Sequence, residues 1–175
     1  MVGVRVLESC SIDRLRLDDL LAPHHQPDMR HAQMCMIYFL GCEGDAPLTA
    51  PWSEASPSFY VAQPESHQAE RVRAHLPFPC IRSLGAHTGC GCGFRCDWAG
   101  PVDTDPEETA AAQADHDALA RYLSGLPPQR RRMQIYGCWY GDEAKRPEHH
   151  RSVSIAELAS PEFVFHEREL ITLTS

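Results

Sequence analysis

The stretch DPEETAAAQADHDALARYLSGLP at residues 105–127 carries the clearest helix signal in the chain. Asp105 can accept a hydrogen bond from an unpaired N–H group of the first turn, and the proline after it loses no hydrogen bond at the first helical position. Intervals of three and four residues define one buried stripe, made of Ala112, His116, Leu119, Leu123 and Leu126. The sequence therefore predicts a helix over about 105–124 that buries Leu119 and Leu123 against a sheet, with His116 as a hydrogen-bonded core residue.

The segments on either side of this helix are rich in residues that favour strands. CMIYFL at 35–40 is continuously apolar, and MQIYGCWY at 133–140 combines aromatic and β-branched residues, so both are predicted to be interior strands. Shorter strand signals occur at 58–62, 80–84, 164–165 and 170–174. Because strands outnumber helices and do not alternate with them regularly, we expect an α+β fold with a largely antiparallel sheet, one main helix and shorter helices.

Weaker signals fill the remaining segments. Residues 2–7 resemble a strand, and a short helix with several leucines is expected to follow them. Residues 64–76 are polar and compatible with a helix, whereas the charged stretch 141–151 is predicted to be a loop. Ser154 and Glu157 have the spacing of a capping box, which predicts a short helix there.

Composition limits the possible functions. A length of 175 residues with 43% apolar residues suits one domain, spanning 1–175, with a sizeable core. The formal net charge of −8, with Arg130–Arg132 as the one basic run, argues against a nucleic-acid partner. No stretch approaches the roughly 18 apolar residues of a membrane span, and the first residues are charged throughout, so we expect a cytoplasmic protein. Its eight cysteines are then expected to form no disulfide.

The most distinctive segment is the run from Cys80 to Cys96, which contains GAHTGCGCGFRC at 85–96. If this run is extended, its cysteines and Phe94 share one face and its glycines share the other. A glycine face permits close approach of a ligand or of another part of the protein, so the candidate ligand-binding residues are Gly89, Gly91 and Gly93. The alternative is that the cysteines are small core residues of a structural or interaction protein.

The same run offers thiolate and imidazole groups, which are the ligands that zinc prefers. The candidate metal ligands are His87, Cys90, Cys92 and Cys96, with Cys80 or Cys138 as substitutes. Their spacing differs from that of zinc fingers and of the common ferredoxin motifs. Because alternate residues of a flat strand lie too far apart to share one ion, metal binding requires a turn at the glycines.

The alternative to a binding protein is a thiol-dependent enzyme. One of Cys90, Cys92 and Cys96 would be the nucleophile, with His87 as its base or Arg95 as a positive neighbour. The sequence has no C-x-x-C pair and no G-x-C-x-G elbow, so neither a thioredoxin-like site nor a hydrolase-like site is supported. The sequence therefore favours a small cytoplasmic protein that binds zinc or a small molecule at 80–96. It does not specify a reaction or an oligomeric state.

Overall fold

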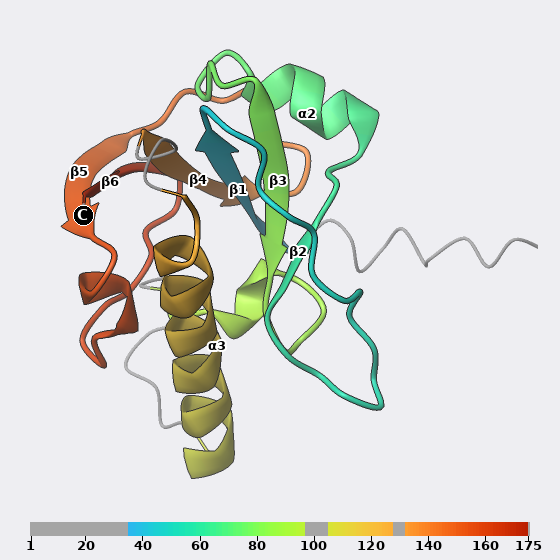
Figure 1. The fold of residues 1–175 in the computed structure, drawn as a ribbon, viewed down its shortest axis with the longest axis vertical. Coiled ribbons are helices and arrows are strands. Elements are labelled where there is room, and N and C mark those ends of the chain that lie inside the picture. The colour runs from blue at the N-terminus through green and yellow to red at the C-terminus, as the bar shows by residue number, and fades with distance from the viewer. Residues whose placement is uncertain (1–34, 97–104, 128–131, 175) are drawn as a thin grey trace, which may run out of the picture.

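The computed structural model describes residues 35–96, 105–127 and 132–174, so the expected strand at 2–7 and the leucine-rich helix after it lie outside the described residues. Six strands form one sheet in the order β2-β3-β1-β4-β6-β5 (Figure 1). The strands are β1 Met36–Cys42, β2 Tyr60–Ala62, β3 Cys80–Gly85, β4 Met133–Trp139, β5 His149–Ser154 and β6 Glu169–Thr174. The helical elements are α2 Ser66–Val72, α3 Pro106–Ser124 and the 3₁₀ turns η2 Gly91–Gly93 and η5 Glu157–Ala159. Neighbouring strands are antiparallel except for β5 and β6, which confirms the predicted α+β class.

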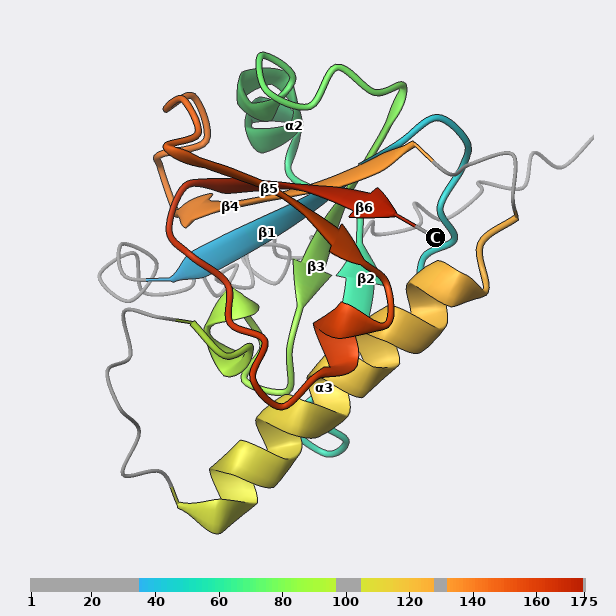
Figure 2. The same ribbon diagram turned by 90° about the vertical axis from the view of Figure 1, so that its left-hand side faces the viewer.

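The two predicted interior strands lie at the centre of the sheet and are covered on both faces. The helix α3, with η2 and η5, covers one face, and α2 covers the other (Figure 2). Tyr38 and Leu40 of β1 belong to the core on the α3 side, whereas Phe39 packs in a second cluster with Val72 and Leu76. This alternation explains why the segment 35–40 is apolar without interruption.

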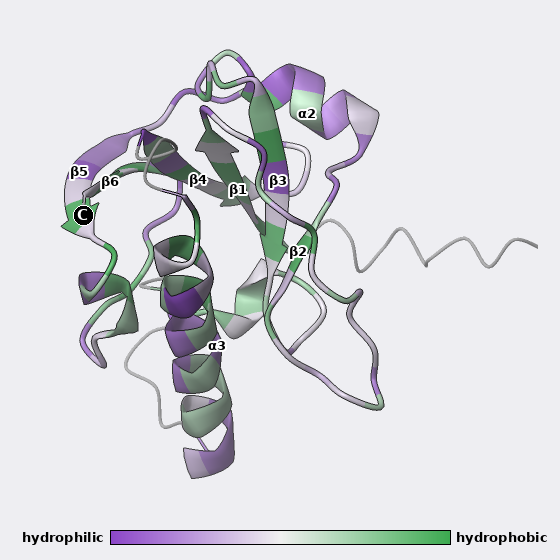
Figure 3. Ribbon diagram, viewed as in Figure 1, coloured by the Kyte–Doolittle hydropathy of each residue, from purple (hydrophilic) through white to green (hydrophobic). Residues whose placement is uncertain are grey.

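The main helix begins and ends as its sequence predicts. The carboxylate of Asp105 accepts a hydrogen bond from the Glu107 N–H at 3.0 Å, and Gly125 follows the last helical residue. Leu119 and Leu123 are buried against the sheet. In Figure 3, α3 carries both hydrophilic and hydrophobic residues along its length, as a helix with a single buried stripe should. No helix within the described ranges is both long and apolar enough to span a bilayer.

His116 is the core histidine expected on this stripe. Its side chain is fully buried, its Nδ1 lies 2.9 Å from the Leu158 carbonyl oxygen, and its Nε2 accepts the Arg95 N–H at 3.1 Å. These partners require a neutral ring with the proton on Nδ1. Burial, with the Arg95 charge beside it, lowers the pKa of His116 to about 4. His116 therefore acts as a polar connection between α3, η5 and the segment after η2.

The predicted loop at 141–151 is wrong at its end, because β5 begins at His149. The strand lies at the edge of the sheet, and its exposed histidines give no apolar alternation for a sequence pattern to reveal. Main-chain pairing with β6 holds it in place, together with an ion pair of 2.7 Å between Arg151 and the buried Glu169. The reciprocal bonds of the predicted capping box are present, between Ser154 and Glu157 at 2.7 and 3.2 Å, but only a three-residue 3₁₀ turn follows, with Ala156 at its N-cap. Near 164–165 the structure has only an isolated bridge between Phe165 and Cys96.

Candidate functional site

The Cys/Gly run folds into a compact turn and is not extended, so its cysteines and glycines do not occupy opposite faces of a strand. The strand β3 ends at Gly85, and the chain then reverses, with the Ala86 N–H bonded to the Cys90 carbonyl oxygen at 2.9 Å. Gly89 has a φ of +81°, a left-handed conformation that glycine adopts without strain. The turn that shared metal binding requires at the glycines is therefore present.

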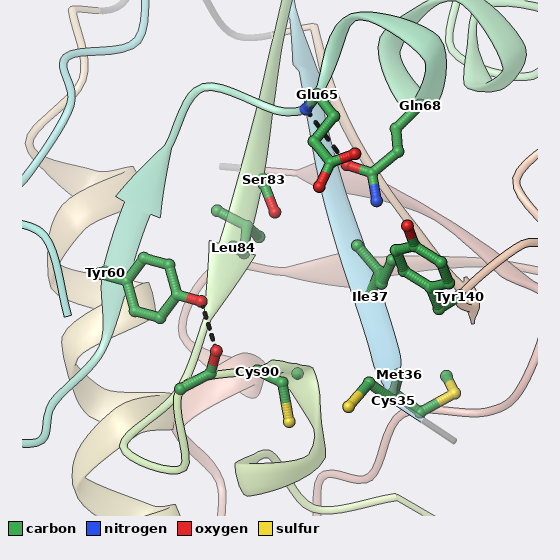
Figure 4. A pocket seen from close by; sticks show the side chains of 12 residues that line it. Cys35, Met36, Ile37, Tyr60, Glu65, Gln68, Ser83, Leu84, Cys90 and Tyr140 are labelled. Atoms are coloured by element: carbon green, nitrogen blue, oxygen red, sulfur yellow. Dashed lines mark hydrogen bonds between the residues drawn. The ribbon is translucent and has the colours of Figure 1, made fainter. Parts of the chain in front are cut away.

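Contacts from two other segments fix this turn. Tyr60 of β2 donates its hydroxyl hydrogen to the Gly89 carbonyl oxygen at 2.7 Å, as Figure 4 shows. The Trp52 indole N–H donates to the His87 carbonyl oxygen at 2.7 Å. Because Tyr60 belongs to β2, which pairs with β3, its bond to Gly89 ties the turn to the sheet.

The turn brings Cys90 and Cys92 together with Cys35, and the three sulfur atoms all lie within 4.8 Å of one another. Cys35 immediately precedes β1, and η2 packs against β1. Antiparallel pairing with the register Tyr38↔Leu84 sets the first residues of β1 beside the end of β3. The sequence pattern did not identify Cys35 as part of this site, because strand pairing, and not spacing along the chain, brings it beside Cys90 and Cys92.

Two predicted metal ligands lie outside this thiol cluster of Cys35, Cys90 and Cys92. Cys96 is buried, and its thiol donates to the Phe94 carbonyl oxygen at 3.0 Å. The His87 ring Nδ1 lies 2.6 Å from the Asp115 carboxylate, which also accepts the His87 backbone N–H at 2.9 Å. Asp115 is buried on α3, so this carboxylate orients the imidazole toward the helix.

The possible substitute ligands also lie elsewhere. Cys80 is paired with Cys42 at the opposite end of β1, and Cys138 packs in the cluster on the α2 side. None of the seven cysteines in the described part of the chain forms a disulfide. The four that lie outside the thiol cluster are largely buried, as small core residues are: Cys42, Cys80, Cys96 and Cys138.

Hydrogen bonds to sulfur favour negative charge in the thiol cluster. The Cys92 N–H donates to the Cys90 sulfur at 3.4 Å, and the Met36 N–H donates to the Cys92 sulfur at 3.2 Å. The pKa of Cys90 is lowered to about 5, chiefly because the Cys92 thiol donates to its thiolate, with the Cys92 N–H and the Thr88 hydroxyl adding to the effect. The pKa of Cys92 is raised because that same bond holds its proton. Burial is the largest cause of a raised pKa at Cys35.

A pocket of about 260 Å³ adjoins the thiol cluster. Cys35 and Cys90 lie at one end of it, with Gly89 and Gly91 also in its wall. At the other end Figure 4 shows the polar side chains of Glu65, Gln68, Ser83 and Tyr140. A small molecule in this pocket would therefore meet sulfur at one end and hydrogen-bonding groups at the other.

A side chain at any of the three glycines of the run would crowd another part of the protein. A Cβ atom on Gly91 would lie 2.6 Å from the Tyr38 ring and 2.7 Å from the Met36 carbonyl oxygen. One on Gly93 would lie 2.7 Å from the Ala86 Cβ, and one on Gly89 would lie 3.1 Å from the Trp52 ring. These contacts explain the absence of side chains there, and ligand contact with the glycine backbone stays a prediction.

The site thus combines three adjacent thiols, N–H groups directed at their sulfurs and an open pocket beside two of them. Such a group can coordinate a soft metal ion or react with an electrophile. Comparison of the chain with models of protein families, with curated proteins and with solved structures gives no match.

Proposed function

We propose that this protein binds one zinc ion through the sulfur atoms of Cys35, Cys90 and Cys92. The observation that carries the proposal is the mutual approach of the three sulfurs to within 4.8 Å. Zinc–sulfur bonds of about 2.3 Å in a tetrahedral site require sulfurs roughly 3.8 Å apart. Rotation of the three side chains can supply a contraction of this size without a change of fold.

The hydrogen bonds of the thiol cluster support this proposal. Three thiolates around Zn²⁺ leave a net charge of about −1, since each ligating cysteine loses its proton. The Met36 and Cys92 N–H groups already point at two of the sulfurs and would offset that charge. Metal binding would also release the Cys92 proton to solution. This removes the hydrogen bond from the Cys92 thiol to the Cys90 sulfur, which raises the pKa of Cys92 in the metal-free protein.

Three protein ligands leave one position of a tetrahedral zinc ion for a water molecule or a small ligand. The pocket beside Cys35 and Cys90 gives such a ligand access to this position. Structural zinc sites are usually closed by four protein ligands, so the geometry favours a site that exchanges a ligand. Because unprotected thiols persist in a reducing environment, we place this activity in the cytoplasm.

Elemental analysis of untagged protein tests the zinc proposal. We expect about one zinc per chain, and a thiolate-to-metal charge-transfer absorption when Co²⁺ replaces zinc. Cys35→Ala, Cys90→Ala and Cys92→Ala should each lose the metal while retaining a folded circular dichroism spectrum. Cys96→Ala is the matched control, because Cys96 belongs to the same run but bonds to Phe94. Equal metal loss in a folded Cys96→Ala variant, or none in Cys35→Ala, would contradict the proposal.

A thiol-dependent enzyme with Cys90 as nucleophile is the second candidate. The observation in its favour is that Cys90 lines the pocket and its sulfur accepts the Cys92 N–H. This candidate enzyme does not use His87 as a base, because Asp115 engages the Nδ1 atom of His87. In metal-free protein, selective alkylation of Cys90 that is unchanged in His87→Ala would support this candidate. Uniform, slow alkylation of all cysteines would exclude it.

A further inference from the structure

Only two of the three residues of the thiol cluster line the pocket. Cys35 and Cys90 are among the lining residues, and Cys92 is not. Figure 4 shows the sulfurs of Cys35 and Cys90 facing one another at the end of the pocket. They lie within 4.8 Å of each other, so a small solute in the pocket would meet both sulfurs together.

We infer that Cys35 and Cys90 form a reversible disulfide when a peroxide enters the pocket, and that this bond prevents zinc from binding. The disulfide goes beyond the proposed function, because its formation needs no metal, and only the loss of zinc binding rests on that function. It shares only the cysteines with the zinc site. Two of the three metal ligands would be consumed, and Cys92 alone cannot retain the ion.

The reaction balances with peroxide as the oxidant. One of the two sulfurs, as a thiolate, attacks a peroxide oxygen, the O–O bond breaks, and a sulfenic acid and hydroxide form. The other thiol attacks the sulfenic sulfur, the S–O bond breaks, and water leaves with the proton of that thiol. Two sulfurs are oxidised by one electron each, and the two peroxide oxygens are reduced. Because both sulfurs face the pocket, the outcome is the same whichever of them reacts first.

Geometry selects Cys35 and Cys90 over the other cysteine pairs. Cys90 and Cys92 are only two residues apart in a turn, where the Cys92 N–H already bonds to the Cys90 sulfur. Cys42 and Cys80 are directly paired on β1 and β3, but both are buried and neither lines the pocket. Side-chain rotation of Cys35 and Cys90 can bring their sulfurs to the roughly 2.05 Å of a disulfide.

The test uses metal-free protein with Cys10→Ala, because Cys10 lies outside the described residues. The protein is treated with hydrogen peroxide, alkylated with iodoacetamide and mapped by peptide mass spectrometry. We expect one disulfide, between Cys35 and Cys90, that a phosphine reductant reverses. It should persist in Cys92→Ala and be absent from Cys35→Ala and from Cys90→Ala. Zinc uptake should fall to background after oxidation and recover after reduction.

Two outcomes overturn the inference: full alkylation of Cys35 and Cys90 after peroxide, or a disulfide that maps to another pair such as Cys42 and Cys80. Failure of the zinc proposal gives a different result. A protein that forms the Cys35–Cys90 bond but takes up no zinc contradicts only the zinc proposal. One that binds zinc through the thiol cluster but forms no such bond contradicts only the disulfide.

Discussion

Hydrogen-bond partners that are distant in the sequence decide the roles of two histidines, His87 and His116. His116 contacts Leu158 and the Arg95 backbone, whereas His87 contacts Asp115. His87 belongs to the cysteine run and His116 packs beside it, but their hydrogen bonds give them different roles. His116 is a neutral core residue with both ring nitrogens occupied, and His87 is half-buried and held by a carboxylate.

The neutral state of His116 predicts a loss of stability in mild acid. Its pKa is about 4 in the folded protein and 6.5 in the absence of burial, so the unfolded chain binds more protons between these pH values. The contribution of His116 is therefore fully present above about pH 6.5 and is lost as the pH falls toward 4. We expect a loss of about 3 kcal/mol in the free energy of unfolding over this range, from the conversion of the pKa difference.

Urea denaturation of the wild type and of His116→Gln at several pH values measures this effect. Glutamine can donate and accept hydrogen bonds but cannot be protonated in this range. The variant should be less stable at pH 7 and should show a smaller pH dependence. An identical pH dependence in the two proteins would show that another group causes the loss.

Replacement of His87 should affect stability and not metal content. His87→Ala removes the ring from the buried Asp115 carboxylate, which keeps the His87 backbone N–H as a donor. Loss of one partner of a buried polar group costs about 1–3 kcal/mol. We expect the unfolding midpoint in urea to fall while zinc stoichiometry stays equal to that of the wild type. A folded His87→Ala protein without zinc would place His87 in the metal site, as its spacing in the sequence suggested.

At the scale of elements, the site is made where the first residues of β1 meet the turn that follows β3. Local patterns in the sequence identify β1, β3 and α3 as elements, because each has continuous or periodic apolar residues. They do not specify which strands are neighbours. The turn itself is encoded by glycines whose conformations and contacts leave no room for a side chain at Gly91.

Gly91→Ala tests the coupling between this turn and the thiol cluster. The added methyl group would lie 2.7 Å from the Met36 carbonyl oxygen and 2.6 Å from the Tyr38 ring, so β1 and η2 must separate. Overpacking of this kind costs about 1–3 kcal/mol. Because Cys90 and Cys92 flank Gly91, we also expect weaker zinc binding in competition with a chelator. Gly125→Ala is the control, since its methyl group would meet atoms only at 3.4 Å and beyond. Equal effects of the two substitutions would refute the steric argument.

At the scale of the whole molecule, the thiol cluster joins the beginning of the described chain to its middle, at one end of the neighbouring strands β1 and β3. A ligand that binds only the folded state stabilises it by mass action. We expect zinc at 100 times its dissociation constant to add about 2.7 kcal/mol to the free energy of unfolding. Thermal melts with zinc and with excess chelator measure this effect. The shift should vanish in Cys35→Ala and persist in Cys96→Ala, and a shift that persists in Cys35→Ala would indicate zinc bound elsewhere.

Sequence reasoning recovers the parts of the molecule that depend on local pattern. The main helix, both interior strands and the α+β class follow from apolar periodicity, and His116 follows from its place on the buried stripe. The edge strand β5 was missed because polar residues held by main-chain bonds leave no such pattern. Cys35 was missed, and His87 was grouped with the thiols, because strand pairing and a buried carboxylate on α3 decide their positions.

The edges of the sheet have a consequence for association between chains. The strand β2 has only three residues, and Thr49 covers its centre. The Thr49 backbone N–H donates to the Val61 carbonyl oxygen at 3.1 Å, and the Thr49 hydroxyl oxygen accepts the Val61 N–H at 2.8 Å. The other edge, β5, presents the exposed, polar His149 and His150. Short, covered or polar edges are poor templates for an added strand. The sheet is thereby protected against edge-to-edge growth into aggregates, so its interior strands can be strongly apolar without promoting intermolecular β-pairing.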